Sequence, residues 1–278
     1  MHLSTVEARL EYNVRQPSHL LFNVEAAHWS TQVIVAERLE VTPPVSLHAY
    51  EDAASGNRFV RFDARPGPLV VAYKADVEVH APVLDDARLV EVPVNQVPDA
   101  VLRHLLPTRF CESDLLAAFA RERFGALPPG VERVRAIVRW VRETIAYRPG
   151  SSCSTTTAQE VIAQRAGVCR DFAHVAITLC RALNIPARLV AGYVWFDEPP
   201  QDFHAIFEAW LGGRWVLFDP TGMAPVERLV RIGTGRDAKD VAFSTSFGDI
   251  QMVAKLVTVL EHDARAPLAA SARERADA

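Results

Sequence analysis

Residues 1 to about 95 alternate between apolar and polar side chains, which is the pattern of half-buried β-strands. Residues 6–14, Val-Glu-Ala-Arg-Leu-Glu-Tyr-Asn-Val, show the alternation most clearly, and turn signals such as Arg65-Pro66-Gly67 separate the runs. Several short strands at this spacing predict an antiparallel β-sandwich. No reactive cluster accompanies it, so we interpret it as a structural or docking domain. The other predicted strands are residues 18–24, 32–41, 59–64 and 68–79.

A helical period replaces this alternation after about residue 107. Apolar side chains recur at intervals of three and four over residues 131–146, which predicts an amphipathic helix. Thr157 and Glu160 have the spacing of a capping box for a short helix, and Ser113 is placed to cap an earlier one. The predicted helices are residues 114–124, 131–146, 158–164 and 169–183. The arginines of the second helix fall off its apolar stripe, where we expect solvent: Arg133, Arg135, Arg139 and Arg142.

Strands return in the last third of the chain. Gly212-Gly213, between two apolar runs, is a strong hairpin signal. The strands predicted here are residues 187–196, 202–211, 214–219 and 251–260, and residues 233–237 are a predicted loop. A block of strands followed by a mixed block predicts an α+β protein. We divide it into a β-sandwich domain (1–95), a mixed domain (96–265) and a frayed or weakly helical tail (266–278).

Composition and charge exclude little but favour an ordinary folded protein. The 278 residues are 49% hydrophobic and 23% charged, with a net charge of -4 and no long basic run, so neither nucleic acid nor an anionic membrane is an expected partner. The first 13 residues lack the apolar segment of a secretory signal, and no apolar run approaches membrane-spanning length. We therefore expect a cytoplasmic protein, in which the four cysteines, none in a CxxC pair, are free thiols.

Cys169 is the candidate nucleophile. It lies in the first turn of a predicted helix, where unpaired N–H groups and the helix dipole favour a thiolate. Gly167 removes side-chain bulk just before it, which would let a substrate carbonyl approach. Taken alone, Cys169 could equally be a small buried hydrophobe, which free cysteines often are. We keep that interpretation for Cys111, Cys153 and Cys180, although Cys153 falls in a polar loop.

The predicted hairpin brings a histidine and an aspartate together. If Gly212-Gly213 is a two-residue loop, Leu211 pairs with Arg214, and by the same count Ile206 lies opposite Asp219. His204, two residues before Ile206, then becomes a diagonal neighbour of Asp219 on one face. A three-residue loop would put the two side chains on opposite faces. The shared face would let Asp219 hold one ring nitrogen and aim the other at a thiol.

Three groups of residues together resemble the transglutaminase-like superfamily of papain-like thiol enzymes: residues 167–174, Gly-Val-Cys-Arg-Asp-Phe-Ala-His; His204-Ala205; and Trp215 with Asp219-Pro220-Thr221. The segments 185–188, 192–193 and 232–237 are similar to its bacterial branch, whose amino-terminal β-domain matches the character of residues 1–95. The resemblance covers nearly the whole chain. It implies an α+β core in which the helix carrying the cysteine packs on an antiparallel sheet.

The resemblance also implies roles. Cys169 would be the nucleophile, His204 the base and then the acid, and Asp219 the orienting group. The backbone N–H of Cys169 would stabilise the oxyanion, and Gln164 is a second candidate donor by analogy with papain-like enzymes. Many relatives carry an aromatic residue after His-Ala, where this chain has Ile206.

These roles imply thiolate attack on the amide of a peptide or protein and a thioester intermediate, released by water or by an amine. No cofactor or metal is implied, and no acidic loop of the EF-hand type is present. A metal site is a weaker alternative, because the residues lack the paired spacing of zinc sites. The stronger alternative is a catalytically inactive binding or scaffold protein on the same fold.

Overall fold

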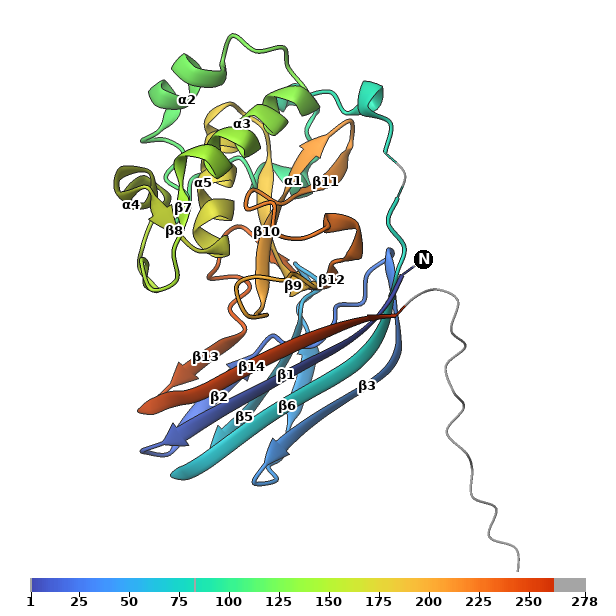
Figure 1. Cartoon of the computed structure of the whole chain (residues 1–278), viewed down its shortest axis with the longest axis vertical. Helices are drawn as coiled ribbons and strands as arrows, with labels where there is room; N and C mark the ends of the chain where they lie inside the picture. The colour runs from blue at the N-terminus through green and yellow to red at the C-terminus, as the bar shows by residue number, and fades with distance from the viewer. Residues whose placement is uncertain (1, 83, 263–278) are drawn as a thin grey trace, which may run out of the picture.

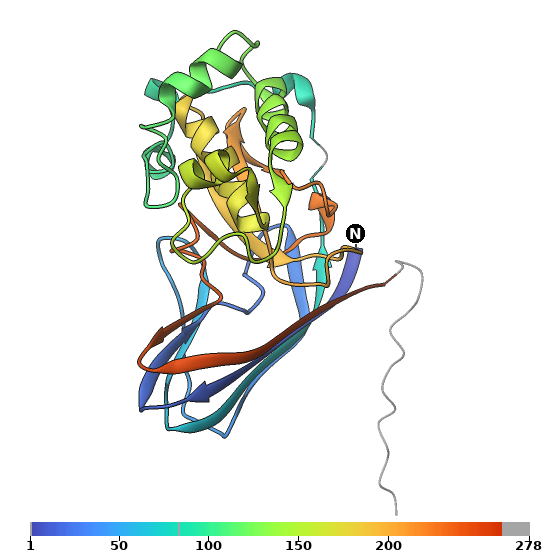
Figure 2. The ribbon, with the colours of Figure 1, turned by 60° about the vertical axis from the view of Figure 1, so that its left-hand side comes forward.

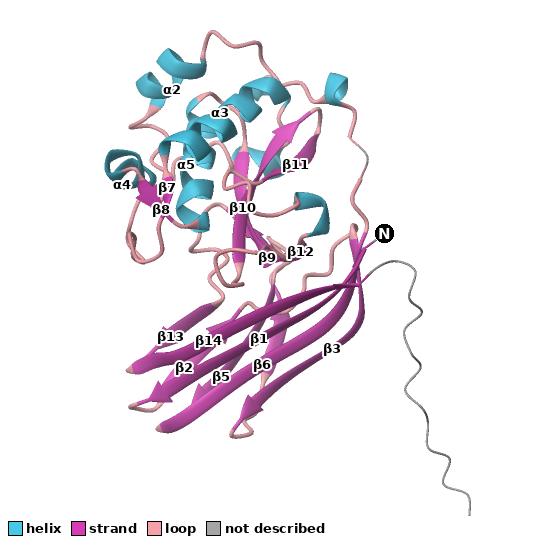
Figure 3. Cartoon of the chain, in the orientation of Figure 1, coloured by secondary structure: helices cyan, strands magenta, loops and turns pink. Residues whose placement is uncertain are grey.

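The computed structural model describes residues 2–82 and 84–262. Figure 1 shows two parts in contact: a strand-rich lower part and an upper part in which helices surround a smaller sheet. Figure 3 shows the same division by element type, with all the helices in the upper part. The predicted tail, residues 266–278, lies outside the described residues. No helix of the described ranges is long and apolar enough to cross a membrane.

The lower part is the predicted antiparallel sandwich. One sheet has the strand order β14-β1-β6-β3 and the other β13-β2-β5-β4. In β1 the side chains of Val6, Ala8 and Leu10 are buried while those of Glu7 and Arg9 face outward, as the alternation predicts. The strands are β1 (His2–Val14), β2 (Ser18–Phe22), β3 (Gln32–Thr42), β4 (His48–Glu51), β5 (Arg58–Ala64), β6 (Gly67–Val79), β13 (Ser244–Phe247) and β14 (Ile250–His262).

Two strands of this sandwich come from the far end of the chain, which differs from the predicted domain division. β14 pairs antiparallel with β1 from Leu3↔His262 to Val14↔Ile250, and β13 pairs with β2. The predicted last strand, residues 251–260, therefore exists but completes the amino-terminal sheets rather than the 96–265 unit. Pairing over more than two hundred residues leaves no local sequence signal. β4 was also missed, because its four residues are all exposed and show no alternation.

The upper part packs helices against the sheet β11-β10-β9-β12. Helix α5 is central and is buried without interruption from Asp171 to Arg181, so it lies between the sheet and the other helices (Figure 1). The helices are α1 (Asp99–Leu102), α2 (Ala117–Phe124), α3 (Val131–Thr144), α4 (Ala158–Gln164) and α5 (Cys169–Ala182), with short 3-10 turns η1 (Asp86–Arg88), η2 (Val94–Gln96) and η3 (Val226–Arg228). The strands are β7 (Ala146–Tyr147), β8 (Ala166–Gly167), β9 (Ala187–Tyr193), β10 (His204–Leu211), β11 (Arg214–Phe218) and β12 (Val230–Gly235).

Local signals in this part were predicted with mixed success. The capping box is confirmed, since Thr157 accepts from the Glu160 N–H and Glu160 from the Thr157 N–H. The Ser113 cap is wrong, because α2 begins at Ala117 without a side-chain cap. Arg133 is not solvated: it is buried and pairs with Glu91 at 3.0 Å.

The predicted loop at residues 233–237 is corrected as well. Strand β12 continues to Gly235, and all six of its residues are buried. A strand covered on both faces shows no alternation for a sequence pattern to detect, and its two glycines imitate a turn.

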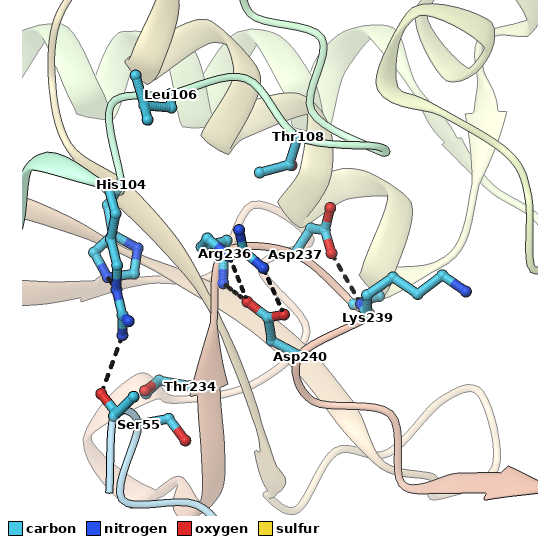
Figure 4. Close-up of polar contacts among 12 residues, drawn as sticks. Ser55, His104, Leu106, Thr108, Thr234, Arg236, Asp237, Lys239 and Asp240 are labelled. Carbon is cyan, nitrogen blue, oxygen red and sulfur yellow. Dashed lines mark hydrogen bonds and ion pairs between the residues drawn. The ribbon is translucent and has the colours of Figure 1, made fainter. Parts of the chain in front are cut away.

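The two parts join along the free edge of β12. The side-chain amide of Gln32 bonds both the N–H (2.8 Å) and the carbonyl (3.0 Å) of Arg231, and Asn57 does the same for Thr234 at 2.9 Å each. These amides, together with the Ala27 N–H that donates to the Arg231 carbonyl at 2.8 Å, satisfy backbone groups along this edge. Figure 4 shows the end of this interface, where Arg236 pairs with Asp240 near Ser55. Figure 2 gives the same junction from a second side.

Candidate active site

Cys169 is the first residue of α5, directly after β8. The carboxylate of Asp171, which is fully buried, accepts the N–H of Val168 at 2.9 Å and pairs with Arg170 at 2.8 Å. The hydroxyl of Ser152 donates to the same carboxylate, so the loop before α4 is tied to the start of α5. This network fixes the backbone on both sides of Cys169. Its thiol is only partly buried.

Gly167 is required by packing at the helix start. A Cβ added at Gly167 would lie 2.7 Å from Cβ of Asp171 and 3.1 Å from its Oδ2. Real Cβ atoms do not approach so closely, so a side chain here would push Asp171 away from the Val168 N–H. Gly167 therefore meets a packing requirement within the protein, and the approach of a substrate carbonyl past it stays a prediction.

The predicted hairpin register is confirmed. Gly212 and Gly213 form a two-residue loop with φ of +56° and +78°, and Leu211 pairs with Arg214. Two successive positive φ values are a conformation that glycine pairs adopt without strain. Pairing continues to Phe207↔Phe218, so Asp219 follows directly at the end of β11.

His204 and Asp219 form a buried hydrogen-bonded pair. Nε2 of His204 lies 3.1 Å from Oδ2 of Asp219, and both side chains are almost fully buried. Asp219 also accepts from the N–H (2.8 Å) and hydroxyl (2.7 Å) of Thr221 and from the N–H of Ala224 (3.1 Å). Burial raises the pKa of Asp219, but the hydrogen bonds and charge of His204 outweigh it and lower that pKa overall. A fixed carboxylate thus holds one ring nitrogen.

The thiol of Cys169 acts on the same imidazole. Burial lowers the pKa of His204, but hydrogen bonds to Asp219 and to Cys169 outweigh it and raise the pKa to about 10. Because Nε2 faces Asp219, Nδ1 is the ring nitrogen that remains for sulfur. Sγ of Cys169 also lies 4.0 Å from the carbonyl oxygen of Phe203, the residue before His204. The geometry therefore brings together the three residues that the sequence singled out, and it favours an imidazolium beside the sulfur.

Gln164 lies in the same region but is held by other groups. Its amide nitrogen donates to the carbonyls of Ala166 at 2.8 Å and Ser151 at 3.3 Å. These bonds tie the end of α4 to the segment that follows it and to the loop that precedes it. A part for Gln164 in oxyanion stabilisation stays a prediction.

Tyr147 is a candidate that the sequence analysis missed. In the parallel pair β7–β8 it lies opposite Gly167, two residues before Cys169, and its ring is 5.9 Å from that of Phe172. Burial raises the pKa of the Tyr147 hydroxyl, and the charge of Cys169 raises it further, while a hydrogen bond with the Cys169 backbone lowers it. The hydroxyl thus lies against both the thiol and the backbone of Cys169. Only long-range pairing brings it there, so no spacing rule would have found it.

The other cysteines differ from Cys169 in their surroundings. Cys111 and Cys180 are buried, and burial raises both of their pKa values, to about 11 for Cys111. Cys153 is exposed, and hydrogen bonds to Thr155 and Thr156 lower its pKa to about 7. It is therefore not a buried hydrophobe, and it will compete in any thiol-labelling experiment. Within residues 2–82 and 84–262, no group of three His, Cys, Asp or Glu side chains is placed to hold a metal ion.

Comparison with known proteins identifies two families along the chain. The transglutaminase-like superfamily core matches residues 117–220, and the bacterial transglutaminase N-terminal domain matches residues 2–100. The crystal structure of a protein from Cytophaga hutchinsonii, named a putative cysteine protease, superposes with a TM-score of 0.91 at 38% identity, over 96% of this chain and 92% of that one.

Relatives in mycobacteria carry no functional name. ML0607 of Mycobacterium leprae is 29% identical over 76% of this chain and 79% of its own length. Rv2569c of Mycobacterium tuberculosis is 34% identical over 46% of each chain. The two matches together cover strands β1 to β6 of the sandwich and the segment that carries Cys169, His204 and Asp219. This chain belongs to the transglutaminase-like superfamily, with the amino-terminal domain of its bacterial branch.

Proposed function

We propose that this protein is a cysteine-dependent acyl-transfer enzyme that acts on amide bonds of peptides or proteins. The observation that supports this most is the buried imidazole of His204, held by Asp219 at 3.1 Å and raised in pKa by Asp219 and Cys169. A thiol paired with an imidazolium is the arrangement that makes sulfur nucleophilic near neutral pH. The partial exposure of Cys169 leaves sulfur accessible to a substrate.

The proposed reaction has two stages. The Cys169 thiolate attacks the carbonyl carbon of the amide, and a tetrahedral intermediate forms with negative charge on oxygen. His204 gives its proton to the departing amine as the C–N bond breaks, which leaves an acyl group on sulfur as a thioester. Water or a second amine, deprotonated by His204, then attacks the thioester and restores the thiol. Asp219 keeps the ring oriented throughout.

Two donors are proposed for the oxyanion. The N–H of Cys169 is in the first turn of α5, where backbone N–H groups have no helical carbonyl to bind. The Tyr147 hydroxyl lies against the same backbone position, and its raised pKa keeps it protonated as a donor. On substrate binding the Cys169 N–H would exchange its hydrogen bond to Tyr147 for one to the oxyanion, and the Tyr147 hydroxyl would donate to the same oxygen.

Hydrolysis is the outcome we propose first. The Cytophaga hutchinsonii structure carries the name of a cysteine protease, and this chain covers 92% of that protein. Transfer to an amine remains the second outcome of the same thioester. We place the reaction in the cytoplasm, because all four cysteines are unpaired thiols, as a reducing compartment maintains.

The test is capture of the acyl-enzyme. A library of peptide amides and activated esters is incubated with the protein, quenched in acid and mapped by mass spectrometry. We expect a mass increase on the peptide containing Cys169, which disappears in Cys169→Ala and persists in the matched control Cys153→Ala. Adding methylamine distinguishes the two outcomes, since amine transfer yields the methylamide product. An unmodified Cys169 across the library, with unchanged affinity of Cys169→Ala for peptides, would favour the inactive binding protein instead.

A further inference from the structure

The loop between β9 and β10, residues 194–203, leads directly to His204 in the candidate active site. Its last residue, Phe203, directly precedes His204, and the carbonyl oxygen of Phe203 is 4.0 Å from Sγ of Cys169. A displacement of this loop would therefore move the His204 imidazole and the Phe203 carbonyl together, and both groups lie beside the sulfur of Cys169.

This loop is attached to β14, an edge strand of the amino-terminal sandwich. Because β14 pairs with β1 on one side only, N–H groups along its other edge need partners from elsewhere. Oε1 of Gln201 accepts the N–H of Val259 at 2.6 Å. Asp202 pairs with Nζ of Lys255 at 2.5 Å. The two loop residues before Phe203 are thus each tied to β14.

An aromatic contact supports the same attachment. The ring of Phe203 stacks on that of Phe243 at 4.9 Å and also contacts Tyr193 at 5.4 Å. Nζ of Lys255 lies 5.4 Å from the Phe243 ring, within the range of a cation–π contact. Phe203 and Phe243 both pack against the hydrophobic core of the sandwich. Lys255 therefore contacts both the Asp202 carboxylate and the Phe243 ring on which Phe203 stacks.

We propose that β14 positions the active site: through Val259 and Lys255 it holds Gln201 and Asp202, and so sets where His204 stands relative to Cys169. The importance of that placement rests on the proposed acyl transfer. Gln201 and Lys255 are positioning residues, since they act through His204 and touch no reacting atom. The amino-terminal domain then has a direct part in the chemistry, supplied by a strand from the far end of the chain.

The expected effect is moderate. The side chains of Lys255 and Asp202 are 30% and 43% exposed, so solvent screens their attraction and the loss would come mainly from a looser loop. Small misplacements of a catalytic group lower rates strongly, and we expect roughly a three- to tenfold decrease in sulfur reactivity.

The test uses the full chain with Cys153→Ser, so that Cys169 is the accessible thiol. Lys255→Met keeps the aliphatic stem and removes the charge, and Asp202→Asn removes the other partner. We measure the rate of Cys169 alkylation by iodoacetamide, the melting temperature, and the imidazole NMR signals of His204, assigned by their loss in His204→Gln. Both variants should slow alkylation and shift those signals at a nearly unchanged melting temperature.

Two controls sharpen the result. Lys74→Met removes the 3.9 Å ion pair with Glu7 on the outer face of the same sheet, and it should change neither alkylation nor the His204 signals. The exchanged pair Lys255→Asp with Asp202→Lys should recover part of the wild-type rate. If Lys255→Met proves unstable, Asp202→Asn, on an exposed loop, decides the outcome.

The result that overturns the proposal is unchanged His204 signals and unchanged alkylation in both single variants. The proposed function fails separately, if wild-type Cys169 alkylates no faster than it does in His204→Gln. In that case the imidazole signals alone decide the positioning role: a shift in the variants supports it, and unmoved signals contradict it.

Discussion

Strand β10 carries two buried charged groups four residues apart, and their surroundings differ. Glu208 is neutralised by Arg188 at 2.7 Å and by Arg231 at 2.5 Å. The guanidinium of Arg188 lies 4.1 Å from the centre of the Trp215 ring, and that of Arg231 lies 4.4 Å from the ring of Trp29. The Glu208 carboxylate and the two guanidinium groups thus form a buried ion-pair network whose members keep their charges.

The groups around His204 behave in another way. Its partners are one carboxylate and one thiol, and the imidazole can gain or lose a proton at accessible pH. The thiol is partly exposed, whereas both partners of Glu208 are buried. The comparison teaches that buried charge alone does not mark an active site. A titratable group beside an accessible nucleophile is the better indication of an active site. Trp215, one of the residues that carry the family resemblance, packs on Arg188 and so belongs to the ion-pair network around Glu208.

The largest expected effect is the loss of acyl-transfer rate in Asp219→Asn. An amide can hold the ring in place but does not stabilise an imidazolium, so we expect acyl transfer to slow about a thousandfold or more. Single-turnover kinetics on the substrate found by acyl-enzyme capture would measure the change. Wild-type kinetics in Asp219→Asn would show that the carboxylate does not act through His204.

Glu208→Gln should affect stability instead. It leaves two buried guanidinium groups without their counter-ion, and breaking a buried ion pair in this way costs about 3–5 kcal/mol. Urea denaturation would measure the loss, while Cys169 alkylation in the folded fraction should stay at the wild-type rate. The exposed control Glu7→Gln should change stability by less than about 0.5 kcal/mol. If Glu208→Gln is as stable as the wild type, the ion pairs of Glu208 do not have the structural role that distinguishes them from the groups around His204.

Tyr147→Phe should give the next smaller effect. The ring and its packing on Phe172 remain, while the hydroxyl loses its contact with Cys169 and its proposed hydrogen bond to the oxyanion. We expect kcat to fall about a hundredfold with little change in KM, since the bond forms in the transition state. Steady-state kinetics would show this. An increase in KM at constant kcat would instead assign Tyr147 to substrate binding.

The remaining prediction is a pH dependence of stability. The pKa of His204 is raised to about 10 in the folded protein, above the value of the unfolded chain. Its stabilisation is therefore complete below about pH 6.5 and is lost as the pH rises through about 10. The difference in melting temperature between wild type and His204→Gln should shrink along that interval. Thermal denaturation from about pH 6 to 10 measures it, and a difference that grows with pH would contradict the raised pKa.

Sequence reasoning reached the parts of the site that local rules determine. The Gly212-Gly213 loop fixed the register that places His204 beside Asp219, and the helix start marked Cys169. Tyr147 was not predicted as a site residue because its position depends on the pairing of β7 with β8. Strand β12 was not predicted because it is covered on both faces.

The contribution of β14 was also beyond local rules. Val259 and Gln201 are 58 residues apart, and nothing near either one predicts that they meet. Tertiary contacts of this kind also place β13 and β14 in the amino-terminal sheets, which no local pattern in residues 244–262 indicates.

The central claim is that His204 makes the sulfur of Cys169 nucleophilic. The most direct measurement is the alkylation rate of Cys169 between about pH 5 and 9 in Cys153→Ser and in Cys153→Ser with His204→Gln. The account predicts rapid labelling below about pH 7 that slows at least tenfold without the imidazole. Equal rates in the two proteins across this range would contradict it.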